Sequence, residues 1–276
     1  MRQTDVEGPP RGLAEFIDTM LARNRGQDTI RTGLSGLDGA TSGGLRKGQL
    51  AVLAGPSGVG TSVLALGIAR HAAVRDRNRT VLLAPDAAQS EILSRLIAAE
   101  ARVPVERIRT GLLGIGDEEK IAATRASLES APLVISSEWP LLPPMVLHEV
   151  GADYGRLGFE LAVVDWTPGS SEDVWGLKAV AQQFNLAVVV TVTARPPTTY
   201  PGPQWPSFAW LREQAALIEV ADLVVAVDRN DLQDARSTRA GEAELTLLKH
   251  RYGPTLLLPP ILFQGRYARF VEPTAG

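Results

Sequence analysis

Short apolar runs alternate with segments of helical periodicity along most of this 276-residue chain, and that alternation restricts the fold strongly. Continuous apolar runs are typical of strands that are buried on both faces of a parallel sheet. Helices between such strands are typical of a doubly wound sheet. The apolar runs lie at 49–54, 80–85, 132–136, 160–166, 186–194 and 222–228, and the helical segments at 62–74, 90–101, 116–129, 143–154, 172–184 and 208–219.

The C-terminal part of the chain has a different pattern. Residues 242–251, 256–263 and 267–272 follow one another with short turns between them, which predicts antiparallel strands. We find no internal repeat and no linker in the sequence. The sequence therefore predicts one α/β domain, residues 30–276, with a mostly parallel, doubly wound sheet and a C-terminal antiparallel extension.

Residues 1–29 are expected to form a polar tail followed by one helix. Apolar residues recur there at helical i, i+3, i+4 spacing, namely Leu13, Phe16, Ile17, Met20 and Leu21. An isolated helix of this length is marginal in water, so its apolar stripe should pack against something. That surface belongs either to its own domain or to a neighbouring subunit.

Composition excludes several kinds of site. The chain has no cysteine and only three scattered histidines, which excludes disulfides, cysteine-based metal sites and a histidine cluster. A net charge of −3 argues against a dedicated nucleic-acid binder, although a local basic patch is compatible with it. No apolar run approaches the roughly 18 residues of a membrane span, and the polar N-terminus lacks the apolar core of a signal peptide. We therefore expect a cytoplasmic protein without membrane contact.

A phosphate-binding loop with one change follows the first apolar run. The pattern G-x-x-x-x-G-K-[ST] fits residues 55–62 except that a threonine replaces the lysine. The loop comes directly after a strand and opens a helix, where backbone N–H groups form an anion cradle. The alternative is an ordinary glycine-rich turn. The candidate nucleotide-binding residues are Gly55, Pro56, Ser57, Gly58, Val59, Gly60, Thr61 and Ser62.

An aspartate at the end of a later strand favours the anion cradle over an ordinary glycine-rich turn. Asp165 ends the apolar run that begins at residue 161, the arrangement that holds Mg²⁺ opposite a phosphate-binding loop. The hydroxyl of Ser62 would be the other protein ligand of the metal. Strand-end aspartates also commonly cap helices, but the combination with the loop favours a metal site.

Several stretches, in their order and spacing, resemble the C-terminal motor domain of DnaB-type replicative helicases, and the resemblance runs from about residue 30 to 272. They are TGLSGLDGATSGGLRKGQLAVLAGPSGVGTSVLALGIARHAA, APDAAQSEILSRLIAAEARVPVERIRTG, LAVVDW, WLREQAALIEVADLVVAVDR and LTLLKHRYGPT. The resemblance implies a RecA-like P-loop NTPase fold that works as a hexameric ring, a homo-oligomer. It also implies that the helix within residues 1–29 is the linker helix that docks on the adjacent subunit.

The resemblance assigns roles to individual residues. The family's P-loop lysine corresponds to Thr61, and its catalytic glutamate to Asp86, which is shorter by one methylene. Asp165 matches the aspartate that organises the metal. The phosphate-sensing glutamine falls at Thr193, or one residue to either side. The basic pair that reaches into the neighbouring subunit's site matches Lys249 and Arg251.

These substitutions lead us to expect weak binding of ATP with Mg²⁺ and crippled hydrolysis. Lys47 precedes the first strand, so it should lie at the wrong end of that strand to replace the lost lysine. The first reading is a DnaB-like helicase motor with impaired or absent ATPase activity. The second is a catalytically dead homologue that acts as a structural or regulatory subunit through a protein partner. The third, a different RecA-like ATPase, fits the matching stretches least.

Single-stranded DNA is the nucleic-acid partner that the resemblance implies, through loops that line the ring's channel. The corresponding segment, residues 194–213, carries only Arg195 and Arg212 as cations. Tyr200, Trp205 and Trp210 are suited either to stacking on bases or to burial against protein. We therefore expect weaker and less salt-dependent DNA binding than an ordinary helicase ring shows. The mildly basic segment 102–111 is expected to connect two helices.

Overall fold

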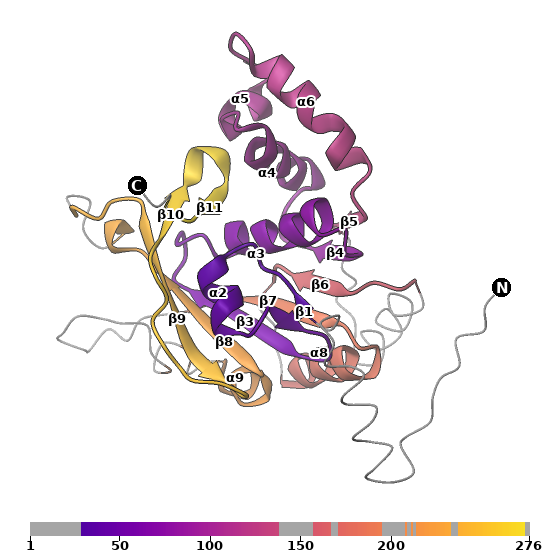
Figure 1. Cartoon of the computed structure of the whole chain (residues 1–276), viewed down its shortest axis with the longest axis vertical. Coiled ribbons are helices and arrows are strands. Elements are labelled where there is room, and N and C mark those ends of the chain that lie inside the picture. Colours follow the sequence, from indigo (N-terminus) through magenta and orange to yellow (C-terminus); the bar gives the residue numbers. More distant parts are fainter. Residues whose placement is uncertain are drawn as a thin grey trace.

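The computed structural model describes residues 29–137, 157–166, 171–194, 214–232 and 237–273, together with Phe208 and Leu211. Within these residues one nine-stranded sheet organises the chain, in the order β11-β10-β9-β8-β3-β7-β6-β4-β5 (Figure 1). Its bounds are β3 (Leu50–Gly55), β4 (Thr80–Leu83), β5 (Leu133–Ser136), β6 (Leu161–Val164), β7 (Ala187–Thr193), β8 (Leu223–Asp228), β9 (Glu242–His250), β10 (Ile261–Gln264) and β11 (Arg269–Val271).

Strand directions confirm the predicted architecture. The pairs from β8 through β3, β7, β6 and β4 to β5 are all parallel. The pairs β8–β9, β9–β10 and β10–β11 are antiparallel. The sheet is therefore a parallel, doubly wound core that is extended by three antiparallel strands at its C-terminal end.

Helices cover both faces of the sheet. Helix α3 (Thr61–Arg70) continues as a π-helical turn η1 (His71–Arg75), and beyond it stand α4 (Gln89–Ala101), α5 (Val105–Thr110) and α6 (Asp117–Glu129). Helices α8 (Ser171–Gln183) and α9 (Ala215–Val220) pack on the opposite face. Short elements complete the described chain: a two-stranded sheet of β1 (Thr29–Ile30) and β2 (Leu45–Arg46), helix α2 (Ser35–Ala40), and the 3₁₀ turns η3 (Asn230–Leu232) and η4 (Gly265–Tyr267).

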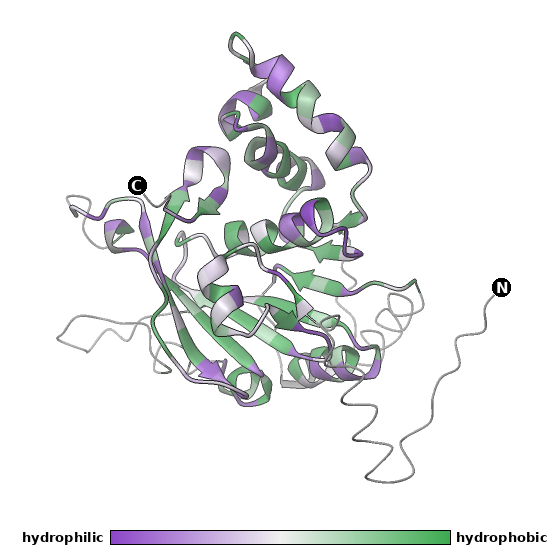
Figure 2. Ribbon diagram, viewed as in Figure 1, coloured by the Kyte–Doolittle hydropathy of each residue, from purple (hydrophilic) through white to green (hydrophobic). Residues whose placement is uncertain are grey.

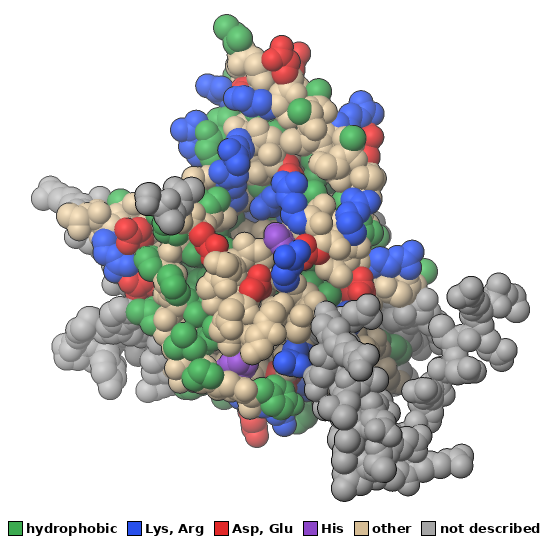
Figure 3. Space-filling model, viewed as in Figure 1, with side chains coloured by type: hydrophobic (Ala, Val, Ile, Leu, Met, Phe, Trp, Pro, Cys, Tyr) green, Lys and Arg blue, Asp and Glu red, His purple; other side chains and the backbone are tan. Residues whose placement is uncertain are grey.

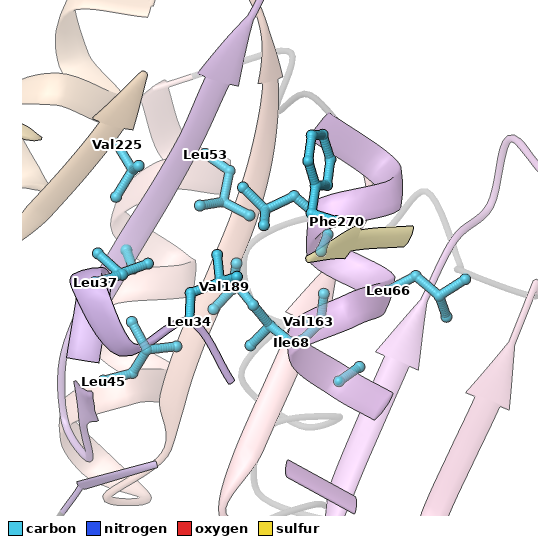
Figure 4. Close-up of a cluster of buried hydrophobic side chains, with 14 of the residues drawn as sticks. Leu34, Leu37, Leu45, Leu53, Leu66, Ile68, Val163, Val189, Val225 and Phe270 are labelled. Atoms are coloured by element: carbon cyan, nitrogen blue, oxygen red, sulfur yellow. The ribbon is translucent and has the colours of Figure 1, made fainter. Parts of the chain in front are cut away.

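Two apolar clusters lie on the two faces because side chains alternate along each strand. In β3, Ala51 and Leu53 contribute to the cluster under α3, whereas Leu50 and Val52 contribute to the cluster under α8 and α9. Figure 2 shows the resulting apolar interior, and Figure 4 shows the first cluster in close-up. The central strands read as unbroken apolar runs because both of their faces are covered.

The structure differs from the expected elements in a few places. The run 256–263 is a strand only from Ile261, because Pro259 and Pro260 cannot donate to a sheet ladder. Residues 29–46 contain α2 and the two-stranded antiparallel sheet of β1 and β2, which the pattern did not reveal. Segment 102–111 connects α4 and α6 as expected, but includes the short helix α5.

Other expected elements lie outside the described residues: the N-terminal helix, the helix 143–154 and the loop 195–207. Of the helix expected at 208–219, α9 is the described part. Among the described helices, none combines the length and the apolar character that crossing a bilayer demands.

Candidate nucleotide-binding site

The predicted phosphate loop lies at the carboxyl edge of the parallel strands, between β3 and α3 (Figure 1). This edge is where ligands bind in open α/β sheets. Gly55 closes β3, and Gly60 is the N-cap of α3 with φ +105°. The sequence therefore places the loop at the edge where phosphate chemistry requires it.

Packing around the loop requires glycine at two of its positions. A Cβ on Gly55 would lie 2.6 Å from Cγ1 of Val59 and 2.8 Å from the carbonyl oxygen of Val227. A Cβ on Gly60 would lie 3.0 Å from the Phe270 ring and 3.2 Å from the Phe263 ring, in addition to the strain of its positive φ. The loop is thus held tightly between β8 and the aromatic side chains of β10 and β11.

The loop retains the donors of an anion cradle. Val59 N–H donates to the carbonyl of Pro56 at 3.1 Å, which closes the turn. By contrast, within the described chain the N–H groups of Gly58, Gly60, Thr61 and Ser62 have no recorded protein acceptor. Unsatisfied N–H groups at a helix N-terminus attract anions. The residues present therefore suit a phosphate group.

Asp165 and Thr193 lie at the same edge as the loop. Asp165 follows β6, and its Oδ1 accepts a hydrogen bond from Thr191 Oγ1 of β7 at 2.9 Å. Thr193 ends β7 directly opposite Gly55 of β3, and its side chain is exposed. The topology thus brings the metal and sensor candidates to the strands beside the loop, with Ser62 in the first turn of α3.

Asp86 lies further along the same edge. It is exposed in the turn after β4, and in the sheet β4 is separated from β3 by β7 and β6. No contact between Asp86 and residues 55–62 is recorded in the described chain. A carboxylate at residue 86 would have to extend along that edge to reach the loop. Aspartate is one methylene shorter than glutamate, so Asp86 extends less far toward the loop.

Arg229, which the sequence analysis missed, touches the loop directly. Its guanidinium donates twice to Asp231, at 3.1 and 2.8 Å, and once to the carbonyl of Gly58 at 3.4 Å. Its Cζ also lies 3.9 Å from the centre of the Phe263 ring. The side chain is only 10% exposed, so it braces the loop tip against β8 and β10. Its position directly after the apolar run 222–228, at the edge shared by parallel strands, was the available signal.

Asp228, the residue before Arg229, has a buried carboxyl group with an unsatisfied oxygen in the described chain. Its Oδ1 has no hydrogen-bond partner among the described residues. Burial raises the pKa of Asp228, the backbone N–H of Arg229 opposes that rise, and the Glu244 carboxylate adds to it. A charged carboxylate at this position therefore destabilises the fold.

Lys249 and Arg251 lie at the opposite, amino edge of the sheet. Lys249 Nζ donates to the carbonyls of Ile218 and Glu219, both at 2.8 Å. Arg251 Nη1 donates at 3.1 Å to Asp222 Oδ1, and the other oxygen of Asp222 accepts from Leu50 N–H, at the start of β3. The two ends of this six-residue strand are about 16 Å apart.

The structure therefore groups the predicted residues into two separate sets. Residues 55–62, Asp86, Asp165 and Thr193 share the carboxyl edge, whereas the basic pair is held away from it. Lys47 also lies at the amino edge, where it pairs with Glu160 at 2.7 Å, so it is as remote from the loop as expected.

Comparisons with known proteins agree with this arrangement. The family model of the DnaB-like helicase C terminal domain matches residues 29–167 and 170–272. A replicative DNA helicase DnaB of Leifsonia xyli subsp. xyli (strain CTCB07) is 33% identical over 260 residues, which cover 88% of this chain and 56% of the relative. The namesake protein of Mycobacterium leprae (strain TN) is 31% identical over 211 residues, which cover 70% of this chain and 34% of the relative. The chain thus spans only about a third to a little over half of these two relatives.

Solved structures share the fold. One solved ATPase domain superposes with a TM-score of 0.84 at 18% identity, covering 97% of this chain and 99% of that one. A DnaB-like replicative helicase, solved in a study of its interactions with primase, gives a TM-score of 0.81 at 18% identity, covering 97% of this chain and 67% of that one. The RadB recombinase is more distant, with a TM-score of 0.54 at 17% identity over 88% of this chain. The carboxyl-edge loop, the RecA-like sheet and the match over almost the whole described chain lead to one conclusion: this chain belongs to the DnaB-like helicase C-terminal domain family.

Proposed function

We propose that this domain binds ATP with Mg²⁺ weakly at residues 55–62 and hydrolyses it barely or not at all. The observation that carries the proposal is a cradle whose N–H donors have no acceptor within the described chain, while Thr61 stands at the position of the cradle's cation. In this site Gly58 and Gly60 would donate to phosphate oxygens, and Ser62 and Asp165 would hold the metal. Mg²⁺ would neutralise phosphate charge when bound.

The missing lysine sets the expected size of the defect. A hydrogen bond to a charged group contributes about 1.5–3 kcal/mol. Losing one weakens nucleotide binding by about ten- to a hundredfold. Loss of a preorganised donor to the transition state costs about 10²–10³ in rate. Binding should therefore survive better than hydrolysis, and Asp86, shorter than glutamate, should position the attacking water poorly.

Arg229 does not replace the lysine in this proposal. Asp231 neutralises the Arg229 guanidinium by two hydrogen bonds, and the guanidinium also contacts the Gly58 carbonyl and the Phe263 ring. Its role is to hold the loop in shape.

We also propose that the domain works as a homo-oligomer, a six-membered ring. Lys249 and Arg251 cannot reach their own loop from the amino edge, so a phosphate that they contact must belong to another copy. In this arrangement Thr193 of the loop's own copy would sense the phosphate.

The second candidate is a catalytically inactive subunit that acts through a protein partner, and Thr61 and Asp86 are the residues that favour it. The two candidates differ in whether nucleotide and DNA binding persist. Phosphate release should be measured on assembled protein, with and without single-stranded DNA. Slow release that DNA stimulates supports the motor, whereas no release and no DNA binding support the inactive subunit.

A further inference from the structure

Arginines gather over α4, α5 and the turn η4, as the blue side chains of Figure 3 show. Several of them face carboxylates, among them Arg95 with Glu91, and Arg107 with Asp117. Three others, Arg102, Arg266 and Arg269, have no carboxylate partner within ion-pair distance in the described chain. We call these three arginines, with Tyr267, the arginine cluster.

The geometry of the arginine cluster concentrates positive charge. Arg266 and Arg269 lie on the same aromatic ring, with Cζ atoms 4.5 and 5.8 Å from the centre of Tyr267. Among the described residues, Arg269 donates only to the neutral Gln264 Oε1, at 2.7 Å. Arg102 directly follows α4, and η4 packs against both α4 and α5.

The carboxylate of Glu100, whose charge acts on Arg269, is already paired with two other arginines. Glu100 is nearly buried and accepts hydrogen bonds from both Arg70 and Arg75. Burial, and then the charges of Arg102 and Arg70, lower the pKa of Arg269. A partly buried cation with cations around it is destabilised unless an anion approaches.

We propose that the arginine cluster binds the phosphate backbone of single-stranded DNA. Guanidinium groups match phosphate oxygens bidentately, and arginines beside an aromatic ring are typical of surfaces that track a single strand. Protein–DNA interfaces are much more positively charged than protein–protein interfaces, and this cluster brings three cations close together. Phosphate therefore suits this surface better than an acidic protein segment.

This inference rests on the motor candidate of the proposed function, in which single-stranded DNA binds the domain and stimulates phosphate release, and it deepens that DNA-binding part. The test is the anisotropy of a labelled oligothymidylate, titrated with the full chain at several salt concentrations. The test variant carries Arg102→Gln, Arg266→Gln and Arg269→Gln. The control carries Arg95→Gln, Arg125→Gln and Arg239→Gln, which removes the same charge from arginines that already face carboxylates.

Three phosphate contacts on a single strand contribute about 2 to the slope of log K against log salt. The test variant should lose that slope and bind about ten- to a hundredfold more weakly at about 0.15 M salt, while the control keeps the wild-type slope. The melting temperature of the test variant should not fall, because the three cations that it loses have no carboxylate partner within the described chain.

Three results would overturn the inference. If the test variant binds DNA as tightly as the control, DNA binding stands but the cluster is not its site. If the wild-type chain binds no single-stranded DNA, both the inference and the DNA-binding part of the proposed function fail. If the substitutions abolish binding of polyglutamate but leave DNA binding intact, the surface serves an acidic protein instead.

Discussion

Restoring the lysine is the most direct way to ask what the phosphate loop still does, and we expect Thr61→Lys to strengthen ATP binding. Thr61 is the first residue of α3, and its N–H is one of the free donors of the cradle. A lysine at this position belongs to the phosphate-binding pattern itself. One charged hydrogen bond, about 1.5–3 kcal/mol, should tighten binding by about ten- to a hundredfold.

The same substitution should destabilise the protein without nucleotide. A cation in the first turn of a helix opposes the helix dipole, which costs about 0.3–1 kcal/mol. A domain of this size loses roughly 2–4 °C of melting temperature per kcal/mol. We therefore expect a melting temperature that is lower by up to about 4 °C without ATP and is recovered when ATP is added.

Isothermal titration with ATP and Mg²⁺ measures the gain, and a phosphate-release assay follows hydrolysis. Thr61→Lys should restore hydrolysis only in part, and adding Asp86→Glu should restore more, non-additively, because both residues act on one reaction centre. Gln182→Lys, on an exposed position of α8, adds the same charge away from the loop and should change neither. Equal affinities for Thr61→Lys and wild type would refute the reasoning, because the loop would then no longer be a phosphate site.

Light scattering at tens of micromolar protein should show an assembly, six subunits in a ring, and a strict monomer in the presence of ATP would contradict it. Asp228→Asn should raise the melting temperature at pH 7 but not near pH 4. The folded pKa of Asp228 lies above its unfolded value, so the wild type loses stability as pH rises from the unfolded pKa through the folded one. If Asp228→Asn raises the melting temperature equally at pH 4 and pH 7, the raised pKa of Asp228 is not the cause. Lys178→Met removes one charged hydrogen bond from the buried Asp222, which keeps Arg251 and the Leu50 N–H as partners, so urea unfolding should report a loss of about 1.5–3 kcal/mol. Arg125→Met, on an exposed pair, should cost less than about 1 kcal/mol, and equal losses would contradict the argument.

Much of the fold could be predicted because the central strands are buried on both faces. The runs at 49–54, 80–85 and 222–228 match β3, β4 and β8 to within about two residues. The strand predicted over 256–263 was wrong in its first five residues. The apolar content of the run does not show that two prolines interrupt the hydrogen-bond ladder. Helix α2 was missed because its glycines lower helix propensity, whereas burial of Leu37 stabilises it.

The candidate site was predictable to the extent that topology decides it. Parallel strands end at one edge, so the loop, Asp165 and Thr193 had to lie near one another. The position of Arg229 after β8 follows from the same argument, but its role could not be predicted, because Asp231, Phe263 and Gly58 define that role and come from three different elements. The arginine cluster was equally hidden, since it depends on η4 meeting the end of α4.

The central claim is that the loop is an intact cradle that binds nucleotide and barely turns it over. The most direct measurement is an equilibrium titration of the wild-type chain with ATP and Mg²⁺, with phosphate release followed in the same samples. Gly60→Ala should weaken binding, because the alanine Cβ would lie 3.0 Å from the Phe270 ring and the φ of +105° disfavours any side chain, whereas Gly67→Ala, in open space on the adjoining helix, should not. We predict weak, saturable binding with little or no phosphate release. Brisk release by the wild type, or no binding at any attainable ATP concentration, would contradict the account.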